Sequence, residues 1–70
     1  MASIAKVIEV IAESDKSFDD AVKNALAEAA RTVDDIRSIW VENLTAMVEG
    51  NEITAYRVNA KVTFVVKGQR

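Results

Sequence analysis

The stretch from Ile53 to Val66 limits the possible folds of this chain more than any other segment. Apolar and polar residues alternate along it, which is the period-two pattern of a β-strand with one face on a core. A strand this long needs partner strands, a core above it and cover for its edge, and 70 residues can hardly provide all three. The apolar face comprises Tyr56, Val58, Ala60, Val62, Phe64 and Val66, and the polar face comprises Arg57, Asn59, Lys61 and Thr63.

Length and composition predict one small domain, residues 1–70, that associates with copies of itself. The chain has no Cys, His or Pro, which excludes disulfides, Cys/His metal centres and catalytic triads built on Cys or His. Its two glycines form no phosphate-binding loop. Half of the residues are apolar and no covalent or metal staple is available, so a homo-oligomer is the expected source of stability. No catalytic or metal-ligating residue is predicted, and we expect no enzyme.

The charge pattern argues against two kinds of partner. The formal net charge is −2 and the basic residues are scattered, whereas nucleic-acid-binding proteins carry a concentrated basic field. No apolar run reaches the length needed to span a membrane. Lys6 and Glu9 interrupt the first apolar stretch, which makes that stretch a poor signal peptide and favours a cytoplasmic location.

The remaining patterns predict a β-α-β-β order. Ser17 is a suitable N-cap ahead of Asp19 and Asp20, and Gly50 and Asn51 tolerate the positive φ of a tight hairpin turn. The fold class is therefore α+β, with one helix covering a three-stranded antiparallel sheet. The expected elements are a strand over 4–12 covered on both faces, a helix over 18–33, strands over 37–48 and 53–66, and a frayed polar tail over 67–70.

The predicted helix combines an apolar stripe with many alanines. The alanines either let the helix lie close to a curved sheet or only supply helix propensity, and the sequence leaves both explanations open. The stripe consists of Phe18, Val22, Ala25, Leu26, Ala29 and Val33, at spacings of three and four residues.

Trp40 is the side chain that most suggests a binding surface. If Ile39 and Val41 point to the helix, Trp40 points away from it. It then shares its face with Arg57 and Asn59 of the neighbouring strand. An indole beside guanidinium and amide groups suits a flat aromatic ligand with polar edges. Burial of Trp40 in a subunit interface is the alternative, and both remain open. The same alternation places Ser38, Glu42, Leu44 and Ala46 on the side of Trp40.

Three blocks of the sequence resemble the dodecin family. They are Lys6–Glu9, residues 17–22 with 24–27, and Tyr56–Phe64, within a similarity that runs from Ala5 to Val66. The resemblance implies a three-stranded sheet curled around the helix and a hollow shell of twelve identical chains, a homododecamer. It also implies a non-catalytic flavoprotein that stores or buffers a flavin (riboflavin, FMN or FAD).

The flavin site that the resemblance implies is altered at two positions. Ser38 stands where the family has its flavin-stacking tryptophan, and Arg57 stands where it has a glutamine. Trp40 lies two positions beyond Ser38, on the same strand face and about 7 Å away. The ligand-binding residues are therefore expected to be Trp40, which stacks, Arg57, which contacts polar or anionic groups, and Ser38, which lines the space left by the missing indole. The alternative is a shell without flavin that is structural, associated with a cation or able to bind coenzyme A.

Overall fold

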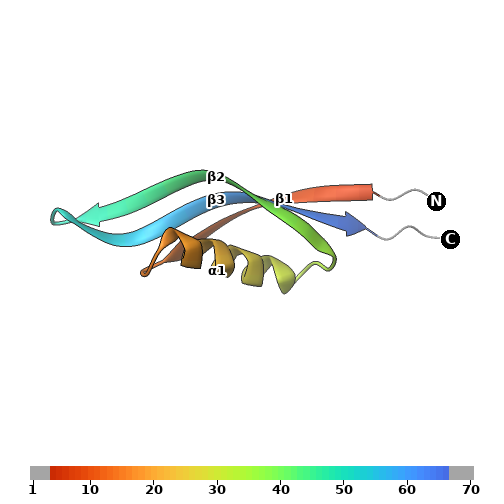
Figure 1. Cartoon of the computed structure of the whole chain (residues 1–70), viewed down its shortest axis with the longest axis horizontal. Helices are drawn as coiled ribbons and strands as arrows, with labels where there is room; N and C mark the ends of the chain where they lie inside the picture. Colours follow the sequence, from red (N-terminus) through yellow and green to blue (C-terminus); the bar gives the residue numbers. More distant parts are fainter. Residues whose placement is uncertain (1–3, 67–70) are drawn as a thin grey trace.

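The computed structural model describes residues 4–66 as a single sheet with one helix. The elements in chain order are β1 (Ile4–Ser14), α1 (Phe18–Ala30), β2 (Ile36–Glu49) and β3 (Glu52–Val66). Both strand pairings are antiparallel, and α1 lies along one face of the sheet (Figure 1). The predicted α+β class and β-α-β-β order are therefore confirmed. The predicted polar tail over 67–70 lies outside the described residues.

β3 is the central strand, because the strand order is β1-β3-β2. The chain therefore provides partners on both sides of its longest strand, and the edges that stay open are those of β1 and β2. The hairpin turn is as predicted, since Gly50 (φ 58°) and Asn51 (φ 66°) both adopt positive φ, as a two-residue hairpin turn of type I′ requires. The β2–β3 hairpin reaches well beyond the helix (Figure 1).

The core lies between α1 and the middle of β3. Val58 is fully buried and packs with Ala21 and Ala25 of the helix. The buried alanines thus allow close approach to the sheet, whereas the exposed Ala27 supplies helix propensity alone. Leu26 was predicted on the buried stripe but is 42% exposed. The helix presents its smallest side chains to the sheet, and Leu26 is about 100° around the helix from Ala25.

Serine hydroxyls fix the turn between β1 and α1. Ser17 is the N-cap, and its Oγ accepts a hydrogen bond of 3.0 Å from the backbone N–H of Asp20. The buried Ser14 donates to the Asp20 carboxylate at 2.7 Å and accepts from the backbone N–H of Lys16 at 2.9 Å. The bond to Ser17 satisfies one backbone N–H group that the first helical turn leaves without an intrahelical partner, and the two bonds of Ser14 tie the end of β1 to the turn and to the helix.

Replacement of Ser17 by Ala is expected to lower the free energy of unfolding by about 1 kcal/mol, because the backbone N–H of Asp20 loses its acceptor. Denaturant titration at matched protein concentration measures this change. Ser17→Asp retains a capping oxygen and should remain close to the parent protein. An equal loss in both variants would show that the capping oxygen is not what stabilises this turn.

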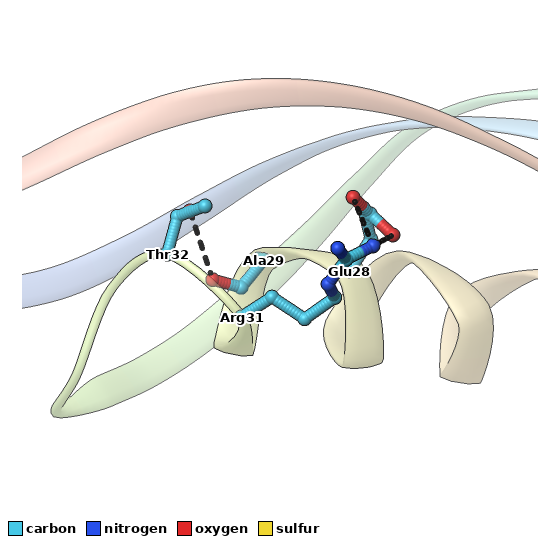
Figure 2. A network of polar contacts seen from close by, with 4 residues as sticks. All are labelled: Glu28, Ala29, Arg31 and Thr32. Carbon is cyan, nitrogen blue, oxygen red and sulfur yellow. Dashed lines mark hydrogen bonds and ion pairs between the residues drawn. The ribbon is translucent and has the colours of Figure 1, made fainter.

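The helix ends three residues earlier than predicted, at Ala30 instead of Val33. Figure 2 shows the polar contacts at this end. The hydroxyl of Thr32 donates to the backbone carbonyl of Ala29 at 3.3 Å, and the guanidinium of Arg31 contacts the carboxylate of Glu28 at 3.2 Å. β-Branched residues at 32 and 33 have low helix propensity, and the Thr32 side chain competes for a helical carbonyl.

A bulge in β2 changes which side chains face the helix. Ile39 and Val41 lie toward the helix and Trp40 away from it, as predicted. The register then shifts between Val41 and Asn43, and such an insertion reverses the facing of the residues that follow, here as far as the next shift after Met47. The prediction that Leu44 and Ala46 share the face of Trp40 is therefore wrong: these residues lie opposite Val58 and Tyr56, on the helix side.

β1 is covered on one face only within a single chain. Val10 and Ala12 pack against the core beneath the helix, whereas Val7 and Ile11, on the other face, are exposed. The predicted cover on both faces is thus not provided by this chain itself. We call the sheet surface that faces away from α1 the outer face.

Candidate functional site

Trp40 lies on the outer face and is 63% exposed. Its register partner on β3 is Lys61, and the register partner of Lys61 on β1 is Glu9. The three side chains therefore form one row across the whole sheet, which we call the Lys61 row. An exposed indole is unusual at such a position because tryptophan strongly favours burial.

Lys61 is held in place by two neighbours. Its ammonium nitrogen lies 5.4 Å from the centroid of the Trp40 ring, within the range of a cation–π contact. The same nitrogen lies 3.8 Å from a carboxylate oxygen of Glu42. Glu42 precedes Asn43 at the bulge of β2, so the bulge sets the acidic partner of this lysine. Both groups of the ion pair are partly exposed, so the pair positions Lys61 more than it stabilises the fold.

A hollow of about 530 Å³ opens on the outer face beside Trp40. This volume is within the range of pockets that hold small molecules, about 300–1,000 Å³. Its walls combine apolar and polar groups around one aromatic surface, which suits a flat ligand with polar edges. The lining residues are Val7, Glu9, Trp40, Lys61 and Thr63.

Ser38 lies beside the hollow, because its register partner is Thr63. It is exposed. It lies two residues before Trp40 on β2 and on the same face, about 7 Å from the Lys61 row. The structure thus brings together Ser38 and Trp40, two of the three predicted ligand-binding residues.

Arg57 is on the same face but lies farther along β3. Its guanidinium Nε donates to the carboxylate of Glu13 on β1 at 2.7 Å, and Nη2 contacts the same oxygen. It is four residues from Lys61 along β3, which corresponds to about 13 Å. Within one chain, therefore, Arg57 pairs with a neighbouring carboxylate and does not approach Trp40.

Comparisons with known proteins give the family. A family sequence model described as Dodecin matches residues 4–67. The chain belongs to the dodecin family. A comparison with curated proteins found no match.

Solved dodecin structures share the fold. The dodecin from Streptomyces davaonensis superposes with a TM-score of 0.91 at 19% identity, over 97% of this chain and 100% of that chain. The dodecin from Streptomyces coelicolor gives 0.89 at 24% identity, over 96% of each chain. The calcium dodecin from Mycobacterium tuberculosis, a calcium chelating immunodominant antigen, gives 0.80 at 30% identity, over 96% of each chain.

Sequence reasoning did not identify three charged residues near Trp40 in this dodecin. Lys61 and Glu9 join the site through strand register, which depends on β3 being central. The period-two pattern placed Lys61 on the face opposite the core. It did not indicate which residues of the neighbouring strands lie beside Lys61. Glu42 was placed correctly on that face, but its contact with Lys61 follows from the bulge, for which the sequence gives no glycine or other marker.

The described part of this dodecin has no grouped metal ligands and no membrane-spanning helix. Among residues 4–66, no three His, Cys, Asp or Glu side chains are placed together as they would be to hold a metal ion. The same segment contains no helix with the length and apolarity that a membrane crossing requires.

Proposed function

We propose that this dodecin is a non-catalytic cytoplasmic protein that stores or buffers a flavin within a closed shell of twelve copies. The flavin ring stacks on Trp40 and extends over the hollow beside it. Ser38 lines the space where other family members carry an indole. Arg57 contacts polar or anionic groups of a ligand held between copies, because it lies too far from Trp40 within one chain.

The observation that carries this proposal is the exposed indole of Trp40 beside the hollow. A flat ring stacked there buries apolar surface on both partners. A ring that enters from the side of Lys61 displaces its ammonium group toward Glu42, which already contacts it at 3.8 Å. Stacking therefore leaves the lysine with a charged partner.

The exposed apolar surface supports assembly. A single chain leaves many large hydrophobic side chains exposed, on both faces of the sheet and along the hairpin, and burial of such side chains against other copies would stabilise an assembly. A closed symmetric assembly also covers the open edges of β1 and β2. The side chains concerned are Ile4, Val7, Ile11, Leu26, Leu44, Val48 and Ile53.

Titration with riboflavin tests the flavin proposal. Trp40 is the only tryptophan, so its own emission and that of riboflavin both report stacking at this residue. We expect both emissions to be quenched at micromolar riboflavin, with an intact assembly that carries flavin mass by native mass spectrometry. An intact assembly with no quenching would contradict flavin binding.

A second candidate is a dodecin shell without flavin, and the calcium dodecin at 30% identity favours it. Ser38 and Arg57, in place of the tryptophan and glutamine of flavin binders, agree with such a role. Symmetry can bring copies of one carboxylate together around a cation even though one chain lacks a metal site within residues 4–66. A calcium chelator should then lower the melting temperature, and an unchanged value counts against a structural cation. Mass spectrometry of ligands released on denaturation tests coenzyme A.

A further inference from the structure

We infer that Lys61 limits access to the hollow beside Trp40, because its side chain occupies the side of the indole on which a ligand ring stacks. Binding of a ring therefore includes the displacement of this lysine. This role rests on the proposed function and deepens it, since it names a residue that sets how tightly the stacking site takes up its ligand.

The position of Lys61 follows from the strand order. β3 is the central strand and Trp40 stands on the edge strand β2, so the hollow lies on the side of the indole that faces the rest of the sheet. Lys61 is in the middle of the Lys61 row, between the indole and β1. A ring that enters the hollow and reaches the indole therefore meets this lysine first. The hollow extends from Trp40 on β2 over Lys61 and Thr63 on β3 to Val7 and Glu9 on β1.

Two contacts hold the ammonium group of Lys61 over the indole. Its nitrogen lies 5.4 Å from the centroid of the Trp40 ring and 3.8 Å from a carboxylate oxygen of Glu42. Lysine side chains usually extend into solvent, but only 34% of the Lys61 side chain is exposed. The side chain thus lies close to the sheet surface, with its charged end directed to the aromatic ring.

The lysine contact and the ligand compete for the same ring surface, because an ammonium group and a stacked ring cannot both lie against one side of an indole. Stacking of a base-sized ring is stronger than a cation–π contact at an exposed site, so the ring displaces the lysine. The displaced ammonium group retains the Glu42 carboxylate as its partner. What is lost on binding is therefore the contact between Lys61 and Trp40.

The size of the effect follows from the strength of that contact. A cation–π contact at an exposed site corresponds to about a two- to fivefold factor in an equilibrium constant. Replacement of Lys61 by a neutral side chain should therefore strengthen riboflavin binding by this factor. A lysine that instead contacted the ligand directly would have the opposite effect, so the direction of the change separates the two roles.

The test measures riboflavin binding to variants of the intact assembly. Lys61→Gln should bind about two- to fivefold more tightly than the parent protein. Lys61→Arg keeps a cation that can lie over the indole and should show no such gain. Lys23→Gln is the matched control, since it makes the same change in charge at an exposed position of α1, and its affinity should equal that of the parent protein.

Unchanged or weaker binding by Lys61→Gln overturns the role of Lys61, and so does an equal gain in Lys23→Gln. Lys61→Met also lacks the charge and replaces Lys61→Gln in the test if that variant does not assemble. A gain in Lys61→Arg as large as that in Lys61→Gln would likewise overturn the competition between the cation and the ring.

A measurement without flavin separates the role of Lys61 from the proposed function. Trp40 is the only tryptophan, so quenching of its emission by acrylamide, a neutral molecule, reports access to the indole in the ligand-free assembly. Lys61→Gln should raise the quenching constant and Lys23→Gln should not. Failure of riboflavin to bind any variant overturns the proposed function. Equal acrylamide quenching of the parent and Lys61→Gln proteins overturns the role of Lys61 even where riboflavin binds.

Discussion

Replacement of Trp40 by Ala should abolish the quenching of riboflavin fluorescence while the assembly stays intact. The indole is the only extended aromatic surface at the hollow, and 63% of it is exposed in the single chain. Loss of stacking on one base-sized ring weakens binding by about 1–3 kcal/mol in comparable sites, and a site with few other apolar walls has little to replace it. Riboflavin emission is the readout, since this variant has no tryptophan.

Trp40→Phe is the matched control, because it keeps a smaller aromatic ring at the same position. It should retain weakened quenching and full assembly. Light scattering distinguishes the two roles weighed for this residue. Breakdown of the Trp40→Ala protein into small species would show that the indole is buried between subunits, and unaltered riboflavin quenching in an intact shell would remove Trp40 from the ligand site.

Replacement of Ala25 by Leu should lower the free energy of unfolding by about 1–3 kcal/mol. Ala25 is completely buried and packs with Val58 of the central strand. The added carbons have no space between α1 and the sheet, so the helix must shift away from the core. Denaturant titration at matched protein concentration measures the change.

Ala27→Leu provides the control for this experiment. It makes the same chemical change two positions along the same helix, on an exposed side chain, and alanine and leucine have similar helix propensity. Its stability should remain close to that of the parent protein. Equal destabilisation by both variants would argue against close contact between helix and sheet as the reason for the buried alanines.

The sequence predicted the elements well because each has a local signal. Period-two alternation marks β3, the Ser17 cap marks the start of α1, and Gly50 with Asn51 marks the hairpin turn. The failures have non-local causes. The helix faces the sheet through its alanines, so Leu26 is displaced to the side, although its hydrophobicity suggested burial. The bulge after Val41 inverts the facing of later residues, and a period-two count cannot detect it.

The candidate site was predictable only in part for the same reason. Trp40 could be placed on the outer face from its neighbours Ile39 and Val41, and the structure agrees. Its partner across the hairpin depends on register, which composition and periodicity do not fix. Lys61 thus takes the position beside the indole in which Arg57 had been expected. The ligand role of these residues stays a prediction until binding is measured.

The central position of β3 has a consequence for protein engineering. Ile4 and Val66 are register partners, so the first and last residues of the sheet lie directly beside each other. A short linker can therefore join these positions, and new termini can be opened at Gly50, where a side chain would meet no atom within 4 Å. Such a circular permutant would keep every strand pairing while converting the β1–β3 contact into a covalently closed hairpin.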